Sequence, residues 1–143
     1  MLPDSGPFLN VATFCEKVIQ SKSGVLSLIN VVDQHNVMAS GPGAPDKMPK
    51  QTINWTLVLT FRSGAARGSK QVKITPEDPS SKDMRTFEVP VRFEGRNRGS
   101  NVVLELGFEV EIPGVYWFRV ELDGEFVTKI PIEVTYGRTV VSA

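Results

Sequence analysis

The chain has 143 residues, a length that fits one domain with a core large enough to fold without disulfides or metals. Its 16 Lys and Arg residues balance 16 Asp and Glu residues, which argues against the broad positive field of a non-specific nucleic-acid binder. The single cysteine, Cys15, excludes an internal disulfide. No apolar run approaches the roughly 20 residues of a membrane helix, and the N-terminus lacks the pattern of a signal peptide. We therefore expect a single cytoplasmic domain over residues 1–143, with no membrane segment and without nucleic acid as its partner.

The N-terminal half predicts three strands and one long loop. Residues 8–20 and 24–37 are rich in apolar and β-branched side chains, and the intervening sequence SKSG predicts a turn. Residues 38–52 contain three prolines and two glycines without periodicity, so we expect a long loop there. In residues 53–64, apolar side chains occupy both parities around Val58, which is typical of a central strand covered on both faces.

Polar segments and a proline divide the middle of the chain. Residues 69–75 predict a short basic strand, and the polar segment 76–84 predicts an exposed loop. Apolar and polar side chains alternate over residues 87–94, a period of two that places one set in a core. Because Pro90 has no backbone N–H, this strand is expected at a sheet edge or at a bulge.

The C-terminal third carries the clearest strand pattern. Apolar residues alternate along residues 104–112 and again along 115–122. The pair Asp123-Gly124 then predicts a tight hairpin, since both residues tolerate the positive φ that a type I′ turn needs. The last strand follows, and Pro131 within it predicts an edge or a bend.

These elements predict an all-β fold of about eight strands joined by short connections and one long loop. Two stacked antiparallel sheets, an immunoglobulin-like β-sandwich, bury such strands economically. A jelly-roll or up-and-down barrel is the alternative, because counting strands does not separate a sandwich from a barrel.

The closing hairpin supports the sandwich. The segment Pro113-Gly114-x-Tyr116-x-Phe118-x-Val120, followed by Asp123-Gly124, resembles the last hairpin of immunoglobulin-like domains. The resemblance implies that Tyr116 is a structural corner, with a buried ring and a hydroxyl bonded back to the backbone. Such a hairpin occurs in unrelated sandwiches, so it implies a fold and no activity.

Both ends of the chain resemble a known family. The segments ATFCEKVIQSKSGVLSLINVVDQ and IPGVYWFRVELDGEFVTKIPIEV resemble a bacterial family of small single-domain β-sandwich proteins known only as a domain of unknown function. The shared features are a Cys-Glu pair in the first strand and a closing Gly-x-Tyr hairpin. The middle, from Met38 to Arg98, carries no matching motif. The resemblance therefore implies no site residues.

Catalytic chemistry finds little support in the side chains. His35 is the only histidine, so no two-histidine metal site exists, and we expect it to be solvated in a loop. Cys15 lies in a predicted strand, where a thiol is usually a small buried hydrophobe. We expect no catalytic residue and no cofactor.

An acidic loop is the one candidate for a metal. Glu77, Asp78 and Asp83 could supply oxygen ligands for calcium together with the intervening serines. Lys82 lies among them, however, and calcium needs six to eight converging oxygens. A solvated loop without metal is the expectation.

Two surfaces are candidates for binding. Alternation turns Trp117 away from the core, and Arg119 beside it completes the composition of an interface anchor. A candidate anion-binding edge would form if two turns lay at the same end of the sandwich. Its residues are Arg67, Lys70, Arg96 and Arg98.

The sequence predicts a non-enzymatic β-sandwich that binds another protein or itself. The expected contacts are exposed strand edges and the face carrying Trp117 and Arg119. The alternative is a module for a polyanion or carbohydrate that uses the loops at one end.

Overall fold

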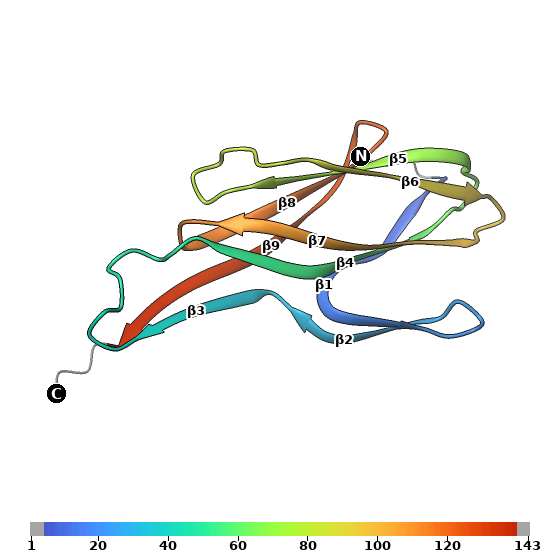
Figure 1. Cartoon of the computed structure of the whole chain (residues 1–143). Helices are drawn as coiled ribbons and strands as arrows, with labels where there is room; N and C mark the ends of the chain where they lie inside the picture. The colour runs from blue at the N-terminus through green and yellow to red at the C-terminus, as the bar shows by residue number, and fades with distance from the viewer. Residues whose placement is uncertain (1–4, 140–143) are drawn as a thin grey trace.

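The computed structural model describes residues 5–139, which form nine strands and no helix (Figure 1). No helix that could cross a membrane occurs in this part of the chain. The strands are β1 (Phe8–Gln20), β2 (Leu26–Val32), β3 (Gln34–Ser40), β4 (Gln51–Arg62), β5 (Arg67–Glu77), β6 (Phe87–Glu94), β7 (Gly99–Val110), β8 (Gly114–Leu122) and β9 (Glu125–Thr139).

The strands form two stacked sheets, which confirms the predicted all-β sandwich rather than the barrel. One sheet has four strands in the order β2-β1-β4-β7, and the other has five in the order β3-β9-β8-β5-β6. All neighbours are antiparallel except β3 and β9, which run parallel. Pro90 lies in β6, at the edge of the larger sheet, as its missing N–H predicts.

The core lies between the sheets and is built by the predicted alternation. Phe14 of β1 and Phe118 of β8 are fully buried and meet edge to face, with ring centroids 4.8 Å apart. Along β4, Leu57 and Leu59 enter the core, while Val58 is buried on the opposite face. The prediction of a central strand covered on both faces is therefore confirmed.

One predicted strand is in fact two. Residues 24–37 were expected to form one strand, but β2 belongs to the smaller sheet and β3 to the larger one. The chain crosses between sheets at Asp33, whose carbonyl accepts a hydrogen bond from the Glu133 N–H. No glycine or proline marks the crossing, so the apolar pattern runs through it unchanged. As a result His35 lies half-buried in β3, and its predicted loop position is wrong.

The long loop is shorter than predicted, covering residues 41–50 rather than 38–52. Met38 to Ser40 complete the parallel pairing of β3 with β9, and Gln51 and Thr52 pair with β7. Backbone pairing therefore extends into residues whose composition predicted a loop.

Candidate functional site

Trp117 lies on the outer face of the larger sheet, where alternation placed it. Its side chain is 39% exposed, opposite Glu77 of β5 and Pro131 of β9 in the ladder. The Lys129 ammonium lies 5.6 Å from the centroid of its ring, a cation–π contact within the chain. Neighbouring side chains thus cover part of the tryptophan.

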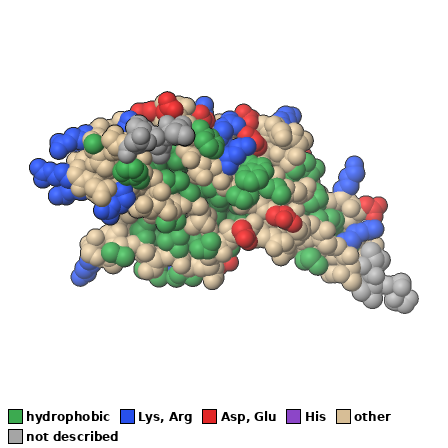
Figure 2. Space-filling view, turned by 180° about the vertical axis from the view of Figure 1, so that it is seen from behind, with side chains coloured by type: hydrophobic (Ala, Val, Ile, Leu, Met, Phe, Trp, Pro, Cys, Tyr) green, Lys and Arg blue, Asp and Glu red, His purple; other side chains and the backbone are tan. Residues whose placement is uncertain are grey.

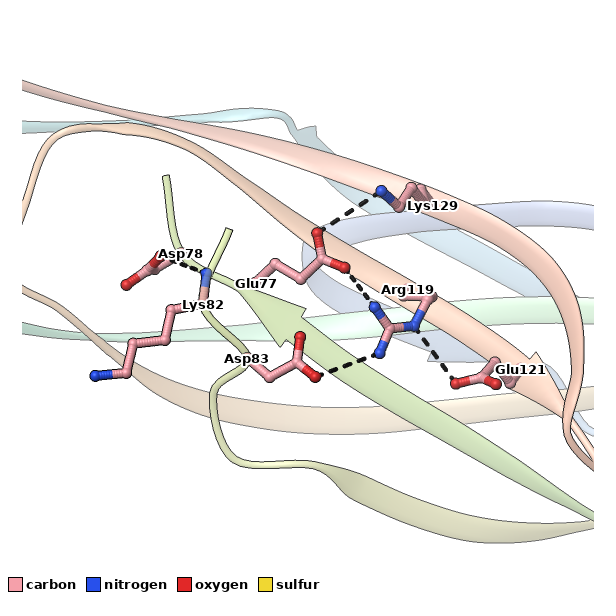
Figure 3. Close-up of polar contacts among 7 residues, drawn as sticks. All are labelled: Glu77, Asp78, Lys82, Asp83, Arg119, Glu121 and Lys129. Atoms are coloured by element: carbon pink, nitrogen blue, oxygen red, sulfur yellow. Dashed lines mark hydrogen bonds and ion pairs between the residues drawn. The ribbon is translucent and has the colours of Figure 1, made fainter. Parts of the chain in front are cut away.

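Arg119 is the centre of a carboxylate cluster (Figure 3). Its guanidinium pairs with Glu77, with Glu121 at 3.5 Å and with Asp83 at 3.6 Å. Lys129 adds a second cation 3.7 Å from Glu77. Burial by itself would lower the pKa of Arg119, but Asp83, Glu77 and Glu121 raise it overall. The guanidinium therefore binds carboxylates of its own chain and is not free to bind a partner.

The carboxylates of the acidic loop are occupied by contacts within the chain. Asp78 accepts hydrogen bonds from the Ser80 hydroxyl at 2.6 Å and from the backbone N–H groups of Ser80 and Lys82, each at 2.9 Å. The Ser80 hydroxyl and these N–H groups lower the pKa of Asp78. Glu77 and Asp83 instead face Arg119. Over residues 5–139, no group of three or more His, Cys, Asp or Glu is arranged to hold a metal.

Cys15 and His35 are not brought together. The Cys15 side chain is fully buried, its sulfur lies 3.5 Å from the Lys17 carbonyl oxygen, and burial raises the pKa of the thiol. The His35 ring packs edge to face on Trp55, with centroids 5.5 Å apart. Each residue thus has a packing role in this structure.

The turns that carry the predicted anion-binding edge do meet at one end of the sandwich. The Asn97 N–H donates to the Gly64 carbonyl at 3.0 Å, and the Ser63 hydroxyl donates to the Gly95 carbonyl at 2.9 Å. These bonds tie the β4–β5 turn to the β6–β7 turn. Figure 2 shows Lys and Arg side chains gathered at the left end of the molecule.

Two of the four predicted cations at this end already have carboxylate partners. Lys70 lies 3.8 Å from Asp123, and Arg98 lies 3.8 Å from Glu94. The Arg67 side chain packs over Gly95, where a Cβ would lie 2.8 Å from its Nε. Arg96 has no carboxylate partner among the described residues and lies at the tip of the turn with φ of 53°.

A feature that the sequence reasoning missed is a projecting hairpin, residues 16–31, which we call the hairpin arm. It comprises the second half of β1, the turn and most of β2, and Figure 1 shows it running out from the bend in β1. None of its residues is buried. Its seven apolar members are Val18, Ile19, Val25, Leu26, Leu28, Ile29 and Val31.

The bend has a local cause. β4 pairs with β1 only as far as Cys15, so the later part of β1 has only β2 as a neighbour. Next to Val31, which faces Cys15, Asn30 adopts φ of 55°, and its amide donates to the Glu16 carboxylate at 2.9 Å. A signal for the arm is present in the sequence LSLINVV, which lacks charge and proline although it forms an edge strand.

Comparison with known proteins identifies a family whose function is unknown. A model described as a family of unknown function, DUF6941, matches residues 10–135. No curated protein matches the chain.

The solved structures that the chain matches are distant from it in sequence and in structure. A β-glucosidase from Listeria innocua is 14% identical with a TM-score of 0.47, and the match covers 90% of this chain but 16% of that enzyme. An immunoglobulin-like protein from Pseudomonas aeruginosa is 10% identical with a TM-score of 0.40, over 92% of this chain and 99% of that one. The DNA glycosylase AlkC of Pseudomonas fluorescens is 12% identical with a TM-score of 0.39, over 72% and 28% of the two chains. Similarity this low does not allow the activity of any of these proteins to be assigned to this chain.

Proposed function

Because the chain belongs to the DUF6941 family, whose function is unknown, we propose a function from its surface: a non-enzymatic β-sandwich that binds another protein chain or assembles with itself. The contact region in this proposal is the hairpin arm. The predicted face of Trp117 and Arg119 takes second place, since the Arg119 guanidinium pairs with three carboxylates of its own chain. We place the activity in the cytoplasm, supported by the single cysteine, which is free and buried.

The observation that carries the proposal is the exposure of the hairpin arm. Val25 and Val31 are 64% and 62% exposed, and even its less exposed apolar residues remain unburied. An isolated two-stranded hairpin is marginally stable in water, because two strands alone bury little apolar surface. A partner chain that covers the arm would remove this apolar surface from water and order both strands.

A site-specific photo-crosslinker tests the proposal. Introduced in place of Ser27, which is exposed on β2, the crosslinker should form a covalent protein adduct in cells of the source organism. The same crosslinker in place of Lys82, exposed in the acidic loop, should not form that adduct. If position 27 yields no adduct while the variant is folded and abundant, the arm is not a binding surface.

A second candidate function rests on the meeting of the two turns at the basic end. Binding of a polyanion or an anionic carbohydrate there would use Arg67 and Arg96, with Lys70 and Arg98 released from their exposed ion pairs. It predicts salt-dependent retention on heparin that the double change Arg96→Ala and Arg98→Ala abolishes. Lys82→Ala is the matched control, and retention unchanged by the double change would remove this candidate.

A further inference from the structure

The hairpin arm presents a backbone edge that is ready to pair. The Ser21 N–H donates to the Val25 carbonyl at 2.9 Å, so this pair is of the hydrogen-bonded type. Hydrogen-bonded and non-hydrogen-bonded pairs alternate along an antiparallel ladder. Ser27 and Ile29 therefore point their backbone groups toward β1, and Leu26 and Leu28 point theirs outward.

The β2 edge lacks the proline and the charged side chains that protect the β6 edge. β6, at the edge of the other sheet, carries Pro90 and three charged side chains. β2 contains neither proline nor charge over Leu26–Val32. An unprotected edge with apolar side chains is a template for strand addition.

We propose that this edge pairs with the same edge of a second copy of the chain, antiparallel and centred on Leu28. The proposal rests on the proposed function and names the partner. In this register the Leu28 N–H and carbonyl groups of the two copies bond to each other. The outward-directed backbone groups of one strand thus meet those of the other.

The side chains are complementary in this register. Positions whose numbers sum to 56 lie opposite one another, so Val25 of each copy faces Val31 of its partner. These two are the most exposed apolar side chains of the hairpin arm, at 64% and 62%. Pairing therefore covers the surface that is most costly to leave in water.

The charges favour the antiparallel arrangement over a parallel one. In the antiparallel arrangement the turn of one copy, which carries Lys22, lies at the end of β2 of the second copy, where Asp33 follows the strand. Because a twofold axis relates the two copies, this contact between opposite charges occurs twice. A parallel pairing would set Lys22 against Lys22 and Asp33 against Asp33, which is repulsive.

The test is the oligomeric state of the full chain by sedimentation equilibrium. The unaltered chain should form a dimer at micromolar concentration. Leu28→Pro removes an outward-directed N–H that makes no bond to β1, and it should weaken dimerisation at least tenfold. A native unfolding transition must confirm that this variant still folds.

Charge reversal provides a second test that does not depend on a proline substitution. Lys22→Asp and Asp33→Lys should each weaken the dimer several-fold at low salt, and the double variant should recover it. Lys82→Asp is the control and should have no effect. If neither single charge reversal changes the dissociation constant of the dimer, the proposed register is wrong.

A chain that stays monomeric at high concentration overturns self-pairing. The crosslinker at position 27 then separates the two proposals. An adduct with a different protein would contradict the second copy and leave the proposed function standing. An adduct of twice the chain mass supports self-pairing, and no adduct at all contradicts both.

Discussion

Arg119 shows how a residue chosen for its sequence neighbours can serve the fold. It was expected beside Trp117 as an interface anchor, and it does share that face. Alternation predicts the face but not the partners, because Glu77 and Asp83 come from a segment about 40 residues away in the sequence. The carboxylates that neutralise Arg119 could not be assigned from local pattern.

Replacing Arg119 by Met should destabilise the protein by about 1–3 kcal/mol, because it leaves a largely buried carboxylate poorly compensated. Glu77 has a side-chain exposure of 15%, and Lys129, at 3.7 Å, would be its one remaining cation among residues 5–139. Urea unfolding measures the change. Arg92→Met, on the exposed side of β6, is the control and should change the free energy of unfolding by less than about 0.5 kcal/mol.

Tyr116 has the corner geometry that its resemblance implied. Its ring is buried, and its hydroxyl donates to the Ile112 carbonyl at 2.7 Å. Burial raises the pKa of Tyr116 above its ordinary value. The folded state therefore holds the phenolic proton more tightly than the unfolded chain does.

Tyr116→Phe should cost about 1 kcal/mol at neutral pH, where the hydrogen bond is intact. Since the folded pKa is raised, the stability that Tyr116 contributes is complete below the unfolded pKa of about 10 and is lost as pH rises through the folded pKa. The difference between the two proteins should narrow above pH about 10. Urea unfolding at pH 7 and in alkaline buffer checks this, and a difference that widens would contradict it.

At the scale of elements, strands with a period of two were predictable and their partners were not. Alternation along β6, β7 and β8 placed their core residues correctly, because burial of one sheet face imposes that pattern directly. The crossing at Asp33 and the parallel pairing of β3 with β9 left no local signal, since both depend on contacts distant in sequence. The hairpin arm was missed for the same reason. Its residues form strands as predicted, and only the absence of a covering sheet distinguishes them.

The β7–β8 connection depends on one glycine. Gly114 has φ of 137°, and a Cβ there would lie 2.7 Å from Pro79 Cβ. Gly114→Ala should therefore destabilise the protein by about 1–3 kcal/mol, through both backbone strain and the clash. Gly43→Ala is the matched control, because nothing lies within 4 Å of its Cβ position. Equal unfolding midpoints for the two variants would contradict the strain at Gly114.

At the scale of the molecule, stability and assembly are linked if the hairpin arm pairs with a second copy. Two arms that cover each other stabilise the folded state by mass action. The melting temperature should then rise with protein concentration, by a few degrees per hundredfold increase, and Leu28→Pro should remove that dependence. Differential scanning calorimetry over a concentration series measures it, and a constant melting temperature for the unaltered chain would contradict the link.

The parallel pairing of β3 with β9 has a consequence for how the protein is made. Asn36 and Thr135 meet across this pair, 99 residues apart in the chain. At a translation rate of about 5–20 residues per second, β3 leaves the ribosome some 5–20 s before its partner. For that interval β3 has no neighbour in its sheet and its backbone edge stays unpaired, so we expect chaperones to engage the nascent chain early and release it only when the last strand emerges.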